Sequence, residues 1–382
     1  MTKASLLLPL LLLAPCLAAD TAAPTPHAAE KLMLKMPEKT KTDACAVEMF
    51  RLLVKQTPKG NVCFSPAAAE QVLDILTKAA ERKTKVTLEK VPVGRKGVPS
   101  SLSPDISSAL LVNKSFRPSA GFYTAADTLS VDFAAADTIR KANDWCNRAT
   151  KSQVKTIWNA KIKPQQFLVL NTLYFQENWE TPFDKELSSK RVFTQPSGKR
   201  TVKMMTTEDT ESILFAKGKN WRAVAKSYKA KVGSGERGFF IAVMPNGDAR
   251  EFIDTLTPEI LADIRHSLGS KPEAYTTFTM PKFTIKGGEN DLDAVWKTMG
   301  LSMLYEKGAN FSALAPNLGP LDGVIQKCYV KVDEVGGAPA RTEEKEKSPN
   351  PKEFSLNRPF LWLIGDLTTD APPLMMGLME EP

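Results

Sequence analysis

The side chains that could carry out catalysis are few, and they do not form a catalytic set. The chain has two histidines, His27 and His266, so a hydrolase that uses a histidine base has few candidates. His27 lies in an Ala- and Pro-rich segment. His266 falls in the helical pattern of residues 261–268, where a surface position is the simpler interpretation. No Gly-x-Ser-x-Gly sequence is present to hold a nucleophilic serine. We therefore predict that the protein is not an enzyme.

A glycine-rich segment, residues 233–238, formally matches the dinucleotide-binding pattern Gly-x-Gly-x-x-Gly. In that fingerprint a helix follows the glycines, because the helix N-terminus binds the pyrophosphate. Here residues 239–245 follow, and their sequence Phe-Phe-Ile-Ala-Val-Met-Pro is typical of a strand. We interpret the glycines as the tip of a hairpin and expect no cofactor.

The cysteines give no sign of a metal or redox site. Beyond the N-terminal segment they are Cys45, Cys63, Cys146 and Cys328. Four cysteines permit three pairings, and the spacing favours none of them. Each lies among apolar neighbours, so we prefer the interpretation that all four are buried free thiols. Because the chain has no Cys-x-x-Cys and only two histidines, no metal site is expected.

Composition and the N-terminus indicate an exported globular protein. The 382 residues are 42% hydrophobic and 25% charged, and the net charge is +8 with the basic residues scattered, so no nucleic-acid partner is expected. Lys3, the apolar run 4–14 and the small residues after it predict a signal peptide at residues 1–19. The run is too short to span a bilayer. Anchoring as a lipoprotein through Cys16 fits less well, because Pro15 precedes that cysteine.

Local patterns predict the organisation of the remaining chain. Residues 20–41 are rich in Ala, Pro, Thr and Lys and are predicted to be a disordered arm, which leaves residues 42–382 as a single domain. Ser65 as a cap and Pro66 at the first helical position predict the start of a central helix. Residues 167–175 are apolar almost throughout, which is typical of a strand covered on both faces.

The last fifty or so residues have a distinctive layout. A strand pattern at residues 327–334 is followed by small residues at 335–340 and by a charged segment at 341–347. Apolar residues then return at 357–364. This order predicts a strand, a hinge of small residues, an exposed loop and a buried return strand.

With that layout, the chain resembles the serpins over nearly all of its mature length. The motifs that carry the resemblance occur in sequence order: Phe64-Ser65-Pro66, Asn171-Thr172-Leu173-Tyr174-Phe175, Trp179, Met280-Pro281-Lys282-Phe283, Ala309-Asn310-Phe311-Ser312 and Pro359-Phe360. The resemblance implies an α+β serpin fold with three β-sheets, about eight helices and an exposed reactive loop at about residues 335–353. In inhibitory members a protease cleaves this loop, which then inserts as a strand into the main sheet and distorts the protease.

The same resemblance assigns residues to two sites that control the main sheet. Ser65, Asn171 and Gln326 would belong to the shutter, a buried polar cluster under the sheet, and Trp179 to the breach, where the loop enters. Two positions depart from the family pattern. Ala68 stands where a second serine is usual, and Gln326 stands where a histidine is common, so the gating of the sheet is expected to differ.

The hinge departs from the family pattern as well. By resemblance it comprises Glu334, Gly336, Gly337, Ala338, Pro339 and Ala340. Gly337 stands where a threonine or serine is expected, and glycine weakens a strand. Pro339 cannot donate a hydrogen bond to a neighbouring strand.

The charged segment is the larger obstacle to insertion. Side chains alternate faces along a strand, so Arg341, Glu343 and Lys345 would share one face. A shift by one residue would instead direct Glu344 and Glu346 to that face. Burying an unpaired charge costs on the order of several kcal/mol. Pairing among the three charges would offset part of this cost.

Three functions follow from these departures. The favoured one is a secreted serpin-family protein that is cut as a substrate or is non-inhibitory, with a role in binding, carriage or storage. The second is a monomeric inhibitor of an extracellular serine or cysteine protease, cleaved in the region Ser348, Pro349 and Asn350. The third is a chaperone-like member, although no Lys-Asp-Glu-Leu-type signal ends the sequence.

Overall fold

The computed structural model describes most of the domain. The described residues are 38–91, 102–159, 163–210, 213–230, 237–270, 273–287, 290–336, 352–367 and 372–382. The predicted signal peptide, Cys16 and the predicted loop residues from Gly337 to Asn350 lie outside them. The predicted boundary between arm and domain, at residue 42, falls inside helix α2 (Glu38–Gln56).

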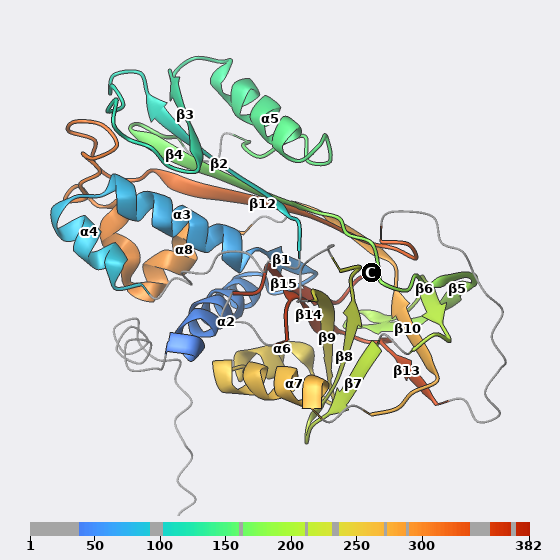
Figure 1. Cartoon of the computed structure of the whole chain (residues 1–382). Helices are drawn as coiled ribbons and strands as arrows, with labels where there is room; N and C mark the ends of the chain where they lie inside the picture. Colours follow the sequence, from blue (N-terminus) through green and yellow to red (C-terminus); the bar gives the residue numbers. More distant parts are fainter. Residues whose placement is uncertain are drawn as a thin grey trace, which may run out of the picture.

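A five-stranded main sheet runs along one side of the molecule (Figure 1). Its strands, in spatial order, are β11 (Phe283–Lys286), β12 (Gly323–Val332), β4 (Phe167–Phe175), β2 (Asp105–Asn113) and β3 (Ala126–Val131). Strands β12 and β4 are parallel and hydrogen-bonded directly to each other from Gly323–Leu168 to Val330–Phe175. The strand predicted at residues 167–175 is confirmed at both ends.

Two further sheets pack below and beside the main sheet (Figure 1). The six-stranded sheet has the order β1 (Val62–Phe64), β15 (Met375–Met379), β14 (Phe360–Gly365), β9 (Phe239–Pro245), β8 (Trp221–Ser227) and β7 (Ile213–Lys217). The four-stranded sheet has the order β13 (Glu353–Ser355), β10 (Thr277–Pro281), β6 (Gly198–Thr207) and β5 (Asp184–Gln195). Because β9 follows the glycine-rich segment, the prediction that a strand and not a helix follows it is confirmed.

Seven α-helices lie in the described part of the chain, compared with the eight or so expected. Besides α2 they are α3 (Pro66–Ala79), α4 (Arg82–Glu89), α5 (Thr138–Ala149), α6 (Ala249–Asp254), α7 (Pro258–Ser270) and α8 (Leu292–Trp296). As predicted, α3 begins with Ser65 as its cap, whose Oγ accepts a hydrogen bond from the Ala68 amide at 3.0 Å. Within the described residues, no helix has the length and apolar character needed to cross a membrane. Three sheets with these helices confirm the α+β class.

Strand β4 is covered on both faces, as its sequence predicts. On the inner face, Val169 joins the core cluster beneath the sheet that includes α3, and Leu173 joins the cluster shared with the other two sheets. On the outer face, Leu170 packs with Trp145 of α5. Cys45, Cys63, Cys146 and Cys328 are free and buried, which confirms the interpretation of the thiols.

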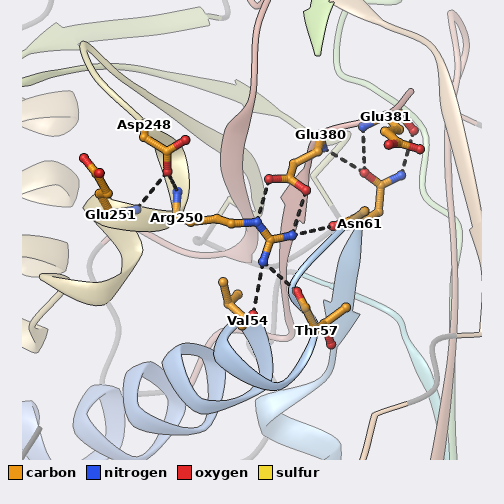
Figure 2. Close-up of polar contacts among 9 residues, drawn as sticks. Val54, Thr57, Asn61, Asp248, Arg250, Glu251, Glu380 and Glu381 are labelled. Atoms are coloured by element: carbon orange, nitrogen blue, oxygen red, sulfur yellow. Dashed lines mark hydrogen bonds and ion pairs between the residues drawn. The ribbon is translucent and has the colours of Figure 1, made fainter. Parts of the chain in front are cut away.

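The C-terminal strand is fastened to the helices by a single arginine (Figure 2). Arg250 of α6 donates from Nε and Nη2 to the two carboxylate oxygens of Glu380, each at 2.7 Å. The same guanidinium donates to the carbonyls of Val54 (3.1 Å), Thr57 (2.6 Å) and Gly60 (3.1 Å). The end of β15 is therefore tied to the end of α2 and to the turn that follows it.

Candidate functional site

The candidate site is the seam between β12 and β4, because the predicted reactive loop begins in the sequence shortly after the end of β12. A strand that entered the main sheet between these neighbours would have to break their mutual hydrogen bonds. Two polar sites hold the seam closed. We call the amide cluster near its middle the shutter (Ser65, Ser108, Asn171 and Gln326), and the attachment at its upper end the breach (Trp179, Phe183 and residues 333–336).

The shutter is a buried network of side-chain amides. Gln326 of β12 and Asn171 of β4 are directly opposite each other, and Gln326 Nε2 donates to Asn171 Oδ1 at 3.0 Å. Gln326 also closes a ring with Ser65, accepting from its amide at 2.9 Å and donating to its carbonyl at 3.2 Å. Asn171 Nδ2 continues the network to Ser108 Oγ at 3.0 Å. These contacts bring together Ser65, Asn171 and Gln326 as predicted, and the Gln326–Asn171 bond crosses the seam.

Position 68, where the family usually has a second serine, is an alanine that adds no side-chain hydrogen bond to the shutter. Ala68 is fully buried and supplies only its backbone amide, which donates to Ser65 Oγ. Ser65 Oγ in turn donates to the carbonyl of Leu374 at 2.6 Å. The shutter therefore crosses the seam through amide groups, which do not titrate between acid and neutral pH.

The breach fastens the start of the loop to the segment after β4. Trp179 Nε1 donates to the carbonyl of Asp333 at 2.8 Å, and the Trp179 amide donates to the carbonyl of Val335 at 3.4 Å. The Phe183 amide donates to the carbonyl of Glu334 at 2.8 Å. The carbonyls of residues 333–335 thus accept hydrogen bonds from two aromatic residues, and Trp179 contacts the start of the predicted hinge.

Glu334 ends the strand as a paired carboxylate. Its side chain is 5% exposed, and it binds Lys282 Nζ at 2.6 Å and Lys203 Nζ at 3.2 Å. Burial by itself would raise the pKa of Glu334, but hydrogen bonds from Lys282, from the Glu334 backbone and from Lys203, together with the charge of Lys282, outweigh it and hold the pKa below its usual value. The carboxylate is therefore ionised at neutral pH and contributes to closure of the breach.

Gly336 completes the turn that leaves the sheet. Its amide donates to Asp333 Oδ1 at 2.9 Å, and its φ of +75° is a conformation that suits glycine. A Cβ at this position would lie 2.4 Å from the carbonyl oxygen of Glu177. Of the predicted hinge, Glu334 and Gly336 therefore have defined contacts, whereas Gly337, Ala338, Pro339 and Ala340 lie outside the described residues.

The return of the loop is also defined. Lys352 donates from its amide to Thr276 Oγ1 at 2.8 Å, and β13 then pairs in parallel with β10. The predicted scissile region, Ser348, Pro349 and Asn350, lies outside the described residues, as do the charges Arg341, Glu343 and Lys345. Among the residues that are described, no group of three or more His, Cys, Asp or Glu side chains could hold a metal ion.

Sequence reasoning missed one residue of the breach, Lys226 of β8. Its side chain is fully buried, and its Nζ lies 4.9 Å from the ring centre of Phe183 and 5.7 Å from that of Trp179. The sequence shows a lysine in the largely apolar run of residues 221–227, but the pattern of the strand does not indicate that this lysine is buried.

Comparisons with known proteins agree with this geometry. A family model described as Serpin (serine protease inhibitor) matches residues 105–382. The chain is 25% identical to Serpin A9 of Homo sapiens over 95% of this chain and 93% of that protein. It is also 25% identical to corticosteroid-binding globulin of Oryctolagus cuniculus over 84% and 90% of the two chains. Among solved structures, human glycosylated kallistatin is similar, with a TM-score of 0.77, 22% identity and coverage of 92% and 99%.

Proposed function

Because the chain belongs to the serpin family, we propose that it is a secreted member whose reactive loop is cut as a substrate or is not engaged by a protease. Its role would then be non-inhibitory, such as binding, carriage or storage. Serpins in general are inhibitors of proteases rather than catalysts. The relatives include a protein named for corticosteroid binding as well as proteins named as protease inhibitors, so family membership does not choose between the two roles.

The observation that supports this proposal is the character of the space that an inserted strand would occupy. On the inner face of the seam, Cys328 and Val330 of β12 lie across from Leu173 and Phe175 of β4, and all four side chains are buried. Lower down the seam, the Gln326–Asn171 amide pair is neutral. An inserted strand would direct every second side chain into this space.

The loop sequence does not suit that space. In one register it would place Arg341, Glu343 and Lys345 against the inner face, and in the other it would place Glu344 and Glu346 there. Each charge left unpaired in such a setting costs on the order of several kcal/mol. This cost would offset the free energy that loop insertion releases in an inhibitory serpin.

A working inhibitor of an extracellular serine or cysteine protease is the second candidate, and the closed seam favours it. The main sheet has five strands, and β12 is hydrogen-bonded directly to β4. If these two strands separated, a further strand could pair with both of them. The breach holds the hinge at Glu334 and Gly336 in an ordered state. If the loop charges paired with one another on insertion, the cost above would fall.

Cleavage of the loop distinguishes the two candidates. A trypsin-like protease has the bonds after Arg341, Lys345 and Lys347 available in the sequence. We expect the nicked protein to unfold at nearly the same temperature as the intact one, and no SDS-resistant complex with the protease to form. A large rise in the unfolding midpoint after nicking would show that the loop inserts and would overturn the proposal. An SDS-resistant complex would establish inhibition.

A matched variant tests whether the loop sequence is the cause. The substitutions Pro339→Ala, Arg341→Ala, Glu343→Ala and Lys345→Ala remove the unfavourable groups and retain Lys347 as a cleavage site. We expect this variant to gain thermal stability on cleavage while the natural chain does not. If neither gains, the obstacle lies in the sheet, at the altered shutter.

Export and a monomeric state belong to the same proposal. The pattern at residues 1–19 supports a signal peptide. Expression of the full chain in a secretory host, followed by N-terminal sequencing of the secreted protein, would test it. The expected mature terminus follows Ala18 or Ala19, and a terminus at Cys16 would instead indicate a lipoprotein.

A further inference from the structure

Lys226 carries a buried amine that has no hydrogen-bond partner among the described residues. It lies near the end of β8 in the six-stranded sheet, between β9 and the edge strand β7, and its side chain is 0% exposed. Among the described residues, no acceptor lies within hydrogen-bonding reach of its Nζ. A buried lysine that lacks such partners is rare, because removal of an ammonium group from water is costly.

The groups around this amine are those that hold the hinge. Its Nζ lies over the rings of Phe183 and Trp179, and these two residues donate hydrogen bonds to the carbonyls of residues 333–335. Tyr228 stacks on Trp179, with its ring centre 4.6 Å from that of Trp179. Displacement of Trp179 and Phe183 would therefore both release the hinge and open a path for water to Lys226.

The charges of the nearby carboxylates do not offset the effect of burial on the pKa of the amine. Burial lowers the pKa of Lys226 to about 7, although the charges of Asp209 and Glu180 act in the opposite direction. Glu180 is engaged elsewhere, since it accepts hydrogen bonds from Ser227 Oγ and from Arg237 Nη1 at 2.9 Å. The aromatic faces offer partial compensation to a cation, but burial outweighs it.

We propose that Lys226 is a positioning residue that keeps the breach easy to open, because its amine is more stable charged and hydrated than buried beneath Trp179 and Phe183. Opening the breach would relieve this cost, so Lys226 lowers the free energy needed to detach the hinge from the sheet. The inference goes beyond the proposed function, since it concerns release of the hinge and holds whether or not the loop then inserts.

The proposal predicts in which direction, and over which pH range, the opening equilibrium of the breach changes. In the closed state Lys226 has a pKa of about 7, whereas a hydrated lysine has one of about 10.4. The open state therefore binds more protons, and opening is favoured as the pH falls from about 10 to about 7 and levels off below that. Between about pH 9.5 and about pH 7 the opening equilibrium should rise by about a hundredfold.

Other titratable groups at the breach do not account for this change of the opening equilibrium with pH. The pKa values of Asp333 and Glu334 are held below the usual carboxyl value, chiefly by hydrogen bonds from neighbouring lysines, so both groups titrate well below the window. Burial raises the pKa of Tyr228 well above its usual value, so Tyr228 titrates above the upper end of this pH range.

The experiment measures hydrogen exchange of the backbone amides in residues 176–184, corrected for the intrinsic rates, from about pH 6 to about pH 10. The full-length natural chain is compared with Lys226→Met, which removes the amine and keeps a flexible apolar chain. Lys190→Met is the control, because Lys190 is exposed on β5. We expect Lys226→Met to slow exchange of these amides by about a hundredfold more near pH 7 than near pH 9.5.

The pH profile separates the proposal from simple repacking. A methionine that merely packs better would slow exchange equally at every pH, and that result would overturn the proposal. So would a natural chain whose corrected exchange in residues 176–184 does not change between about pH 9.5 and about pH 7. If Lys226→Met fails to fold, the profile of the natural chain with Lys190→Met as control still decides the question.

Discussion

Two cationic side chains of this protein, the partly buried Arg250 and the fully buried Lys226, have contrasting surroundings. Arg250 uses its guanidinium to bind both oxygens of Glu380 and three backbone carbonyls (Figure 2). Lys226 has no hydrogen-bond partner among the described residues and lies over two aromatic rings. Arg250 fastens the C-terminal strand to the end of α2, whereas Lys226 lies over Trp179 and Phe183, which hold the carbonyls of residues 333–335. We therefore expect the C-terminal strand to be a fixed region of the molecule and the hinge to be a movable one.

The largest effect is predicted for a substitution in the fixed region, the C-terminal strand that Arg250 holds. Arg250→Met would leave the carboxylate of Glu380, which is 4% exposed, without its partner. Breaking a buried pair in this way costs about 3–5 kcal/mol, so we expect a large loss of stability in urea unfolding. Arg140→Met is the control, since the Arg140–Asp144 pair is exposed and should contribute well under about 1 kcal/mol. If the two variants lose similar amounts, Arg250 is not an anchor.

The second prediction concerns the hinge turn in the movable region. Gly336→Ala would place a methyl group 2.4 Å from the carbonyl oxygen of Glu177 and 2.6 Å from the amide nitrogen of Trp179, at a φ of +75°. The strain is on the order of 2–3 kcal/mol, and we expect it to be relieved by local detachment of the hinge. The measurement is the rate of proteolysis at the hinge, compared with global stability.

Gly308→Ala serves as its control, because a Cβ at Gly308 would meet nothing within 4 Å. Faster hinge cleavage with little change in global unfolding would support a movable region. A loss of global stability as large as that of the Arg250 variant would instead show that the hinge is as fixed as the C-terminal strand.

The third prediction separates the shutter from the breach. Gln326→Met would remove the amide that crosses the seam and take from Asn171 Oδ1 and the Ser65 amide the partner that each has in Gln326. We expect a cost of about 1–3 kcal/mol, because buried polar groups would be left unsatisfied. The cost should be the same at pH 5 as at about pH 9, since amides do not titrate there. Lys327→Met, on the opposite face of β12, is the control, and a pH-dependent cost for Gln326→Met would contradict this account.

How far the sequence predicted each region depends on how local its determinants are. The cap at Ser65 and the strand at residues 167–175 follow from adjacent residues, so local rules found them. The contact between Gln326 and Asn171 joins residues far apart in sequence, and only resemblance to a family placed them together. Such pairings depend on strand order, which composition and periodicity do not determine.

Lys226 shows what local rules could not supply. On β8, Arg222, Val224 and Lys226 alternate with alanines, a pattern that by itself fits a strand with one polar, solvent-facing side. In the structure Val224 lies instead in the core cluster that includes Trp179 and Phe183, so this side of the strand is covered. The burial of Lys226 is a consequence of tertiary packing, and no pattern within the strand records it.

The smallest effect is predicted for the ion pairs of the breach, and it sharpens the contrast with Arg250. Glu334→Gln would remove the charge that Lys282 and Lys203 bind, but these lysines are 36% and 56% exposed, so solvent screens the interaction and the cost should be about 1 kcal/mol. Because the pKa of Glu334 is lowered in the folded state, its contribution is present at neutral pH and is lost as the pH falls through and below the usual carboxyl range. We expect the natural chain and Glu334→Gln to differ in stability at pH 7 and to converge near pH 3, with a smaller difference at high salt. Glu353→Gln, which breaks the exposed pair with Arg191, controls for the loss of a charge. A difference that persists unchanged at pH 3 would mean that Glu334 holds the breach through packing, and the movable region would then depend on Trp179 and Phe183 alone.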